Sequence, residues 1–247
     1  MDNISYTKEI VNYIKRNSTC VMEINQNKCI NKDPYLFSPK NLINLNKMIL
    51  LYNQIFKENI TCIIFVGDIP FNAVSFEGVI ALNNKLYEKP YTFIYKYLPH
   101  EMIHQCNGCK IKYIGHAKEW LRESLTEYVQ LVMLKKILGN KFYNDQIKEY
   151  VKMDTISGDN TKVNLYQFDS EKDRVFLNSL VYGRGVLLFR KIINDDINLL
   201  TQLFYRLKKL KSNVSLIDFM NILGEVSNIN TDLIIRNFIK GNEVIVK

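Results

Sequence analysis

The sequence is poor in histidine, proline and glycine, and it lacks long apolar runs. Only three of its 247 residues are His, five are Pro and ten are Gly. Apolar stretches such as Cys62 to Val66 are strand-sized, well short of the roughly 18 residues that a membrane span needs, so we expect no membrane association. The first ten residues, MDNISYTKEI, include acidic side chains and no apolar signal-peptide segment. We therefore expect no secretory signal and a cytoplasmic protein.

Cysteine is scarce and odd in number. The chain has five cysteines, and an odd number without a signal peptide argues against a disulfide framework. Cys106 and Cys109 form a CxxC pair, but a structural zinc site of thiolates needs a second pair at similar spacing. The sequence has no second pair, so we interpret these thiols as buried or incidental.

The excess of basic residues is modest. Thirty-three Lys and Arg face 25 Asp and Glu, which gives a formal charge of +8. The densest basic cluster lies among leucines and is typical of the wet face of a helix. It consists of Arg206, Lys208, Lys209 and Lys211. No nucleic-acid-binding motif accompanies it, so we expect no nucleic-acid partner.

The pattern of apolar residues predicts strands first and helices afterwards. Hydrophobic residues make up 47% of the chain, enough for a sizeable core. Predicted strands are 18–24, 60–66 and 79–82, with a helix over 42–56 that starts at Ser38 and Pro39. Further helices are predicted over 99–107, 117–138, 141–152, 177–193, 198–209, 216–226 and 231–239, and a polar loop over 154–173. This order predicts an α+β fold, with one domain over 1–247, a sheet-containing part over 1–90 and a helical part over 91–247.

Two of the three histidines bracket a glutamate. His100, Glu101 and His104 form an HExxH motif. Residues four apart lie on the same helix face, so both imidazoles can reach one zinc ion at about 2.0–2.1 Å. Glu101 then lies beside the site, placed to take a proton from a zinc-activated water. We place the start of the motif helix near Pro99, or a kink there, because proline is favoured at the first helical position.

A catalytic zinc site needs a third protein ligand. The HExxHxxGxxH arrangement would place it at Lys110, which excludes that class. Glu119, Glu123 and Glu127 follow on the next predicted helix at four-residue spacing. A carboxylate from a second helix completes a His, His, Glu set, and periodicity alone leaves all three candidates open.

The motif and its surroundings resemble the aminopeptidase N and leukotriene A4 hydrolase family of gluzincin peptidases. Eighteen residues after His104 stands Glu123, within Trp-Leu-Arg-Glu and followed closely by a Glu-Tyr pair. Gln105 and Gly108 match the family's HExxHQxxG continuation. The resemblance implies Glu123 as the third ligand of one zinc ion per chain, and a thermolysin-like catalytic domain over about residues 40–240. The family's other domains have no counterpart here, so we expect a minimal peptidase domain.

A second segment is similar to the same family. Tyr182-Gly183-Arg184-Gly185, leading into an apolar helix, resembles its Tyr-x-Lys-Gly segment. The resemblance implies that Tyr182 donates a hydrogen bond to the oxyanion. A phenol with a pKa near 10 is protonated at neutral pH and can fill that role.

Two departures limit what the resemblance implies. The family's Gly-Ala-Met-Glu-Asn strand carries a Glu that binds the substrate amine, but the matching segment here places Ser75 at that position. Glu77 lies two residues away, at a different place along a strand. Cys106 and Asn107 replace the family's Trp-Phe pair. We therefore expect a zinc endopeptidase or a dedicated peptide-processing enzyme, with a peptide or small-protein substrate.

Three alternatives remain open. An aminopeptidase could read the N-terminus differently, or the domain could bind zinc or peptides without catalysis. The site could also perform other amide-bond chemistry. Glu127 is a candidate partner that orients the zinc histidines, and His116 is expected to be a surface residue.

Overall fold

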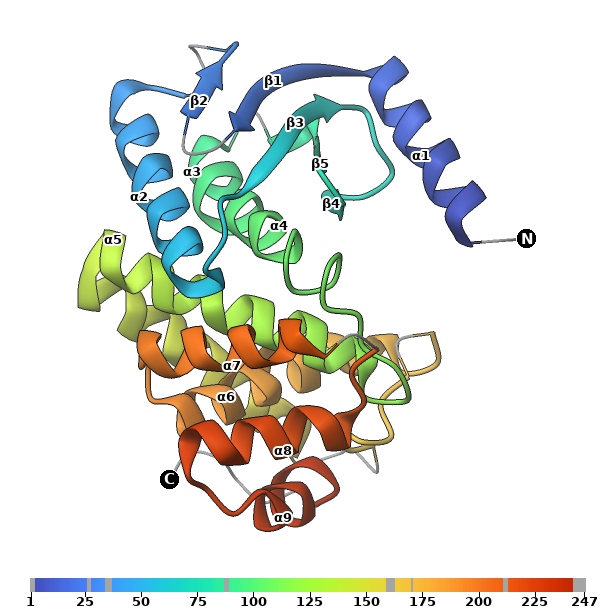
Figure 1. Cartoon of the computed structure of the whole chain (residues 1–247), viewed down its shortest axis with the longest axis vertical. Helices are drawn as coiled ribbons and strands as arrows, with labels where there is room; N and C mark the ends of the chain where they lie inside the picture. The colour runs from blue at the N-terminus through green and yellow to red at the C-terminus, as the bar shows by residue number, and fades with distance from the viewer. Residues whose placement is uncertain are drawn as a thin grey trace. The chain divides into compact units, whose positions relative to one another are not determined.

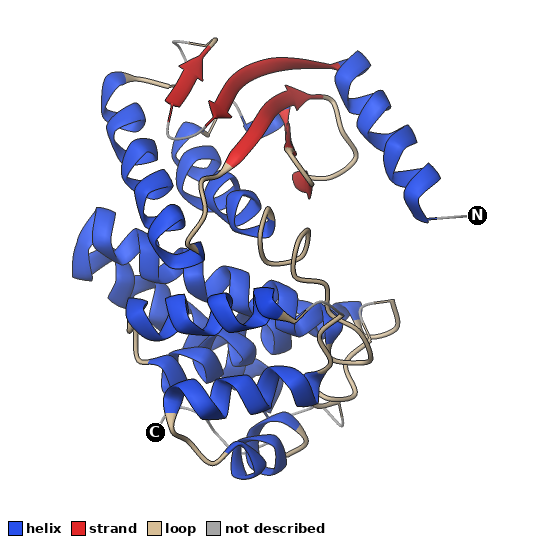
Figure 2. Ribbon diagram, viewed as in Figure 1, coloured by secondary structure: helices blue, strands red, loops and turns tan. Residues whose placement is uncertain are grey.

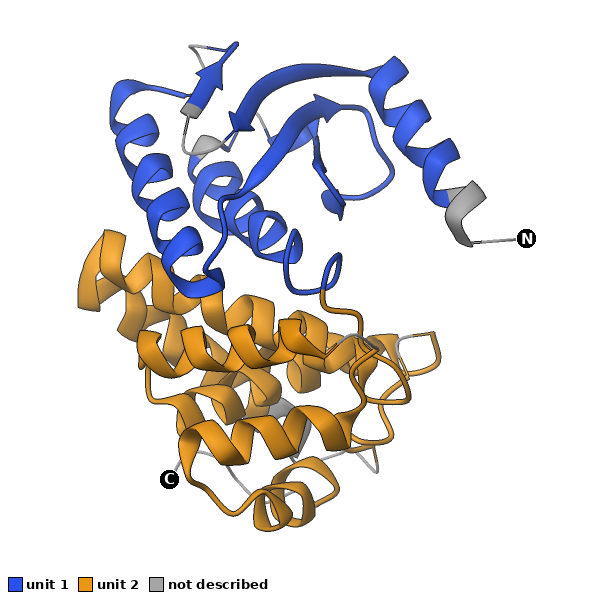
Figure 3. Ribbon diagram, viewed as in Figure 1, with its two compact units in different colours: residues 1–110 blue, residues 111–247 orange. Residues whose placement is uncertain are grey.

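The computed structural model describes residues 3–25, 28–33, 37–86, 89–158, 163–169, 171–210 and 213–241. The chain divides into two compact units, residues 1–110 and 111–247 (Figure 3). The HExxH segment belongs to the first unit. Whether both units form one domain stays a prediction. No helix in the described ranges is long and apolar enough to cross a membrane.

The first unit contains all the strands of the sheet (Figures 1 and 2). Its elements are α1 (Asn3–Asn17), β1 (Ser18–Asn25), β2 (Lys28–Asn31), α2 (Pro39–Phe56), β3 (Thr61–Gly67), β4 (Ala73–Phe76), β5 (Val79–Asn83), η1 (Asn84–Leu86), α3 (Pro90–Thr92), η2 (Phe93–Tyr97) and α4 (Leu98–His104).

The sheet has the order β2-β1-β3-β5-β4, in which only β3 and β5 run parallel. β4 is therefore an edge strand, hydrogen-bonded to β5 in antiparallel register. On one face of the sheet, Phe65, Val79 and Ala81 pack with Ile14 of α1. Because side chains alternate along a strand, Ile80 and its partner Ser75 lie on the opposite face, and α4 contacts β4 and β5.

The structure confirms the predicted strands at β1, β3 and β5 and the predicted helix α2. Ser38 caps α2 by accepting a hydrogen bond from the backbone N–H of Asn41, and Pro39 occupies the first turn. β2, β4 and α1 were not predicted as elements.

The HExxH helix α4 begins at Leu98, which confirms the predicted start near Pro99. Helical structure begins at Pro90 and continues through the π-helix η2 into α4 without a loop. Pro99 has no N–H, and its ring crowds the carbonyl four residues earlier. In the wider π turn the N–H of Leu98 bonds instead to the carbonyl of Phe93, which lets the chain pass through the proline.

The second unit is helical among its described residues, apart from a single bridge between Tyr113 and Val214. Its elements are α5 (Lys118–Gly158), η3 (Arg174–Phe176), η4 (Leu177–Gly185), α6 (Val186–Ile193), α7 (Ile197–Lys209), α8 (Leu216–Ser227), α9 (Thr231–Ile234) and η5 (Ile235–Ile239). α5 spans two predicted helices, 117–138 and 141–152. Gly139, with φ 86° and ψ 178°, forms a non-helical kink between them.

The predicted loop over 154–173 is partly wrong. Residues 154–158 continue α5, residues 163–169 form turns, and residues 159–162 and 170 lie outside the described residues. As far as Lys209, the basic cluster is confirmed as part of a solvent-exposed helix face. Leu203 and Leu207 of α7 are buried, while Arg206 is exposed. Lys211 lies outside the described residues.

The aromatic core of the second unit fixes the start of α5. Trp120 is fully buried and stacks on Phe189 of α6, with ring centroids 5.9 Å apart. Phe189 also meets Phe219 of α8 edge to face at 5.8 Å. Burial of such aromatic rings is a large apolar contribution to stability. The anchored Trp120 stands three residues before Glu123 and orients that turn of the helix.

Candidate metal centre

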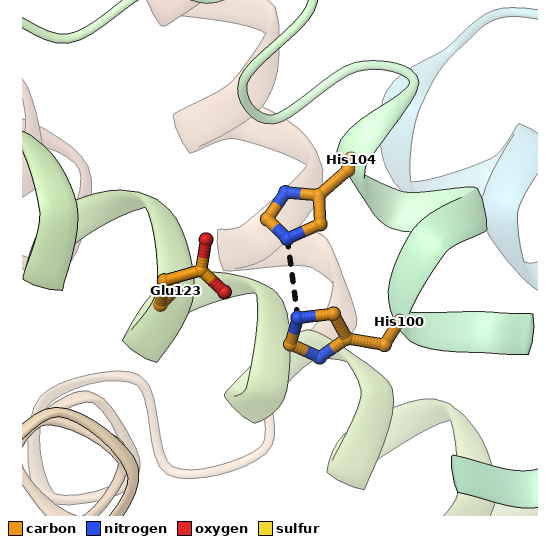
Figure 4. A group of neighbouring side chains, drawn as sticks. All are labelled: His100, His104 and Glu123. Carbon is orange, nitrogen blue, oxygen red and sulfur yellow. Dashed lines mark hydrogen bonds between the residues drawn. The ribbon is translucent and has the colours of Figure 1, made fainter. Parts of the chain in front are cut away.

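The first unit carries the HExxH residues on α4. His100, Glu101 and His104 are buried, with exposed fractions of 9%, 7% and 8%. The Nε2 atoms of His100 and His104 face one another at 3.1 Å, and the imidazole rings are nearly perpendicular (Figure 4). The four-residue spacing thus brings two ligand nitrogens together on one helix face.

A backbone contact sets the tautomer of His104. Its Nδ1 atom lies 2.9 Å from the carbonyl oxygen of Asn107, in the turn after the helix. A carbonyl can only accept, so the ring proton lies on Nδ1 and the lone pair lies on Nε2. Metal-binding histidines are commonly oriented by such a bond from the other ring nitrogen.

These two nitrogens fit a zinc ion. At a Zn–N distance of about 2.0–2.1 Å, one ion can contact two nitrogens that are 3.1 Å apart. Imidazole nitrogen is a preferred zinc ligand, and the tautomer of His104 presents its lone pair on the required side.

The second unit carries the carboxylate predicted as the third ligand. Glu123 lies on α5, and its two oxygens have separate partners. Arg122 donates to Oε1 at 2.8 Å, and the hydroxyl of Tyr182 donates to Oε2 at 3.2 Å. Burial lowers the pKa of the Arg122 guanidinium, but the charges of Glu123 and Glu119 outweigh this and leave that pKa above its ordinary value. The structure therefore brings Glu123 and Tyr182, which the sequence singled out separately, into contact.

The other two glutamates of the series have different surroundings. Glu119 lies 3.9 Å from Arg122. Glu127 accepts a hydrogen bond from the hydroxyl of Tyr150 at 2.7 Å. Burial and the Glu127 charge raise the pKa of Tyr150 well above its ordinary value, so this phenol stays a donor. Glu123 is the member of the series that shares a hydrogen bond with Tyr182.

Close packing holds the Tyr182 segment on α5. The segment is the π-helix η4, and Ser124 donates to the carbonyl of Val181 at 2.6 Å. A Cβ atom on Gly185 would lie 2.1 Å from Oγ of Ser124, and one on Gly183 would lie 2.9 Å from backbone and side-chain atoms of α5. Gly183 is therefore required by the close approach of two backbones, and Gly185 by the Ser124 side chain packed against it.

A buried ion pair makes a further link between these segments. Arg184 donates through Nε to Asp154 at 2.9 Å, and both side chains are less than a tenth exposed. Removing one partner of such a pair leaves an uncompensated buried charge, which is strongly destabilising. The pair therefore fixes η4 against the second half of α5.

The cysteines, Lys110 and His116 were also singled out in the sequence. None of the five cysteines, all of which lie in the described residues, forms a disulfide. Cys106 is buried and Cys109 is half-buried. Lys110 pairs with Glu58 at 3.1 Å. His116 is exposed, as predicted.

Sequence reasoning missed the contacts made by Arg122, by the Asn107 carbonyl and by the side chain of Gln105. Arg122 stands beside Glu123, so its charge was a readable signal. The other two contacts depend on the turn after α4 and on the strand that packs beside it, which no local pattern encodes.

The chain was compared with known proteins by sequence and by structure. No protein-family model matches the chain, and no curated protein sequence matches it. Its structure is similar to solved zinc metallopeptidases. M1 zinc metallopeptidase from Deinococcus radiodurans, in a mutant bound to a Tyr-Ser-Ala substrate, aligns with a TM-score of 0.58 and 14% identity over 81% of this chain and 44% of that chain.

Other M1 structures give the same result. The D. radiodurans enzyme in a further crystal structure aligns with a TM-score of 0.56 and 13% identity, over 81% of this chain and 44% of the enzyme. A two-domain M1 zinc metallopeptidase bound to L-tryptophan has a TM-score of 0.57 and 14% identity, with the same coverage of 81% and 44%. This chain thus spans less than half the length of these proteins and shares the fold of part of them.

Proposed function

We propose that this chain is a zinc-dependent peptidase that hydrolyses peptide bonds with a metal-activated water. The observation that carries the proposal is the facing pair of Nε2 atoms on His100 and His104, which flank Glu101 on α4. The likeness in fold to part of several zinc metallopeptidases supports it.

The proposed ligands of one zinc ion are His100, His104 and Glu123, the three side chains drawn in Figure 4. Two imidazoles and one carboxylate form a known catalytic zinc sphere that leaves a position for water. In this assignment Arg122 and Tyr182 are the neighbours that orient the carboxylate. When bound, zinc supplies a Lewis acid that polarises the scissile carbonyl and lowers the pKa of water.

The roles of the protein groups follow from their chemistry. Glu101 accepts the proton that water loses as its oxygen attacks the carbonyl carbon. The same carboxyl group then gives this proton to the amine nitrogen as the C–N bond breaks. Tyr182 has a single hydroxyl hydrogen, which turns from Oε2 of Glu123 to the developing oxyanion, a contact that strengthens in the transition state.

The edge strand favours internal peptide bonds over free N-termini. β4 reads Ala-Val-Ser-Phe and carries no carboxylate that could pair with a substrate ammonium. Ser75 donates its hydroxyl to the carbonyl of Glu101 at 3.0 Å, and Glu77 is exposed in the turn after the strand. We therefore propose an endopeptidase or a dedicated peptide-processing enzyme. An aminopeptidase with another amine-binding group and an idle binding domain are the alternatives.

The test compares internally quenched peptide libraries with acetylated and with free N-termini, using protein loaded with zinc. The proposal expects cleavage of acetylated peptides, loss of cleavage with a zinc chelator and recovery when zinc returns. Cleavage that requires a free N-terminus would favour the aminopeptidase. Cleavage of many unrelated sequences would reject dedication to one substrate. If protein that holds one zinc cleaves no library, two hypotheses survive: a dedicated processing enzyme and an idle binding domain. Zinc-dependent cleavage of one defined peptide would then identify the processing enzyme.

A further inference from the structure

The side chain of Gln105 joins the edge strand to the end of the HExxH helix. Gln105 follows His104 directly, and only 4% of it is exposed. Its Nε2 group donates to the carbonyl of Phe76 at 2.9 Å and to Oγ of Ser75, while its Oε1 accepts from the N–H of Gly78 at 2.8 Å. One amide thus bonds to the last two residues of β4 and to the turn that follows.

Ser75 extends this connection to Glu101. The hydroxyl of Ser75 accepts from Gln105 and donates to the backbone carbonyl of Glu101 at 3.0 Å. The carbonyls of a helix's last turn lack partners within the helix and need bonds from outside it. At the end of α4 the N–H of Gln105 donates to the carbonyl of Met102, three residues earlier, rather than to the carbonyl of Glu101. The Glu101 carbonyl accepts its bond from Ser75 of β4.

These bonds join β4 to α4, whereas the hydrogen bonds of the sheet join β4 to β5. The ladder between β4 and β5 fixes β4 within the sheet, through pairs such as Ser75 with Ile80. This ladder does not determine the position of β4 along the axis of α4. The chain of bonds from Gln105 through Ser75 to Glu101 does, because Glu101 lies on that helix and Gln105 is its C-cap residue.

We infer that Gln105 and Ser75 are positioning residues that hold the backbone of Glu101 in register with the edge strand β4. The inference rests on the proposed function, in which Glu101 handles the proton. Neither side chain needs to touch the reacting atoms. Their role is to keep the glutamate within the narrow range of positions from which proton transfer is fast, since a displacement of about 1 Å can cost about 100-fold in rate.

The test uses two variants that remove different parts of the connection. Gln105→Met keeps the length of the side chain and removes all its hydrogen bonds. Ser75→Ala removes only the link to Glu101 and Gln105, and Ser75→Thr restores a hydroxyl. Gln202→Met, at an exposed position on α7, is the matched control. Each protein is measured for bound zinc, unfolding midpoint, amide exchange over 73–78, and kcat and KM on the acetylated quenched peptide library.

A positioning role predicts that kcat per bound zinc falls about 10- to 100-fold in Gln105→Met and Ser75→Ala, with KM little changed. Ser75→Thr should recover most of kcat, and Gln202→Met should match the wild type. Because both residues act through one chain of bonds, Gln105→Met combined with Ser75→Ala should lose little more than Gln105→Met alone. Equal kcat per bound zinc in all variants would overturn the inference, whatever happens to stability.

Amide exchange distinguishes failure of the inference from failure of the proposed function. Exchange over 73–78 should accelerate at least tenfold in Gln105→Met and stay unchanged over β3. If the wild type cleaves no library peptide, general endopeptidase activity is rejected, and faster exchange over 73–78 still supports the link to α4. Unchanged exchange would overturn the link itself.

Discussion

The hydroxyl of Tyr182 donates a hydrogen bond to Oε2 of Glu123 at 3.2 Å. The two residues are 59 positions apart and lie within the same compact unit. One is the proposed third zinc ligand and the other is the proposed oxyanion donor. Their contact shows that the packing of η4 on α5 sets both side chains at once, so a disturbance of that packing should affect metal binding and turnover together.

Removing the phenol hydroxyl tests the role of Tyr182. Tyr182→Phe keeps the ring and deletes only the donor, so the protein should keep its fold and its zinc. We expect kcat to fall by about 10²–10³-fold, the usual loss for one oxyanion donor. The measurement is kcat on an internally quenched peptide, with bound zinc determined on the same sample. A variant that retains wild-type kcat would assign the oxyanion to another donor.

Substituting Glu101 tests the proton-transfer step. Glu101→Gln is close in size and cannot accept a proton at neutral pH, so zinc should stay bound while turnover is abolished. Metal analysis and peptide hydrolysis on one preparation check both halves of this prediction. Hydrolysis at the wild-type rate would show that another group accepts the proton of water.

Gly185→Ala tests the packing that holds the Tyr182 segment. The added Cβ would lie 2.1 Å from Oγ of Ser124 and 2.6 Å from its Cβ, so η4 must move away from α5. We expect a loss of about 1–3 kcal/mol in the free energy of unfolding, measured by urea titration. Adding Ser124→Gly removes the clashing atoms and should recover part of the loss. A double variant no more stable than Gly185→Ala would show that the clash is not the cause.

The buried thiol of Cys62 gives a prediction for alkaline pH. Burial, with a smaller effect from Cys29, raises the pKa of Cys62 from 9.0 to about 12. The folded state therefore holds this proton more tightly than the unfolded chain does. The resulting stability is complete below about pH 9 and is lost as pH rises toward about 12. Unfolding midpoints from pH 8 to 11 should fall less steeply in Cys62→Ala than in the wild type, and parallel curves would contradict this.

Local pattern was sufficient to predict most elements. Ser38 and Pro39 marked the start of α2, and Gly139 lies in the gap between the two helices that were predicted before and after it. These signals act within one turn of the chain, where capping chemistry and positive φ leave few choices. The cytoplasmic location remains a prediction.

Contacts between segments that are far apart in the chain could not be predicted from the sequence. Pro99 marked the start of α4, but the π-helix before it was not predicted, and there tertiary packing buries Phe93 and Ile94. The bond from Gln105 to Ser75 joins residues 30 positions apart, and that of Arg184 to Asp154 also spans 30. Glutamine, serine and ion pairs occur throughout a chain, so only the fold selects which of them meet.

Zinc content of Glu123→Ala, compared with the wild type, tests the central claim most directly. Both proteins would be purified without chelator or histidine tag, with Glu119→Ala as the matched control on the same helix. We expect about one zinc per chain in the wild type and in Glu119→Ala, and loss of zinc in Glu123→Ala, because two imidazoles alone leave the sphere incomplete. Zinc retained in Glu123→Ala, or a wild type that binds none even when zinc is added, would contradict the proposed site.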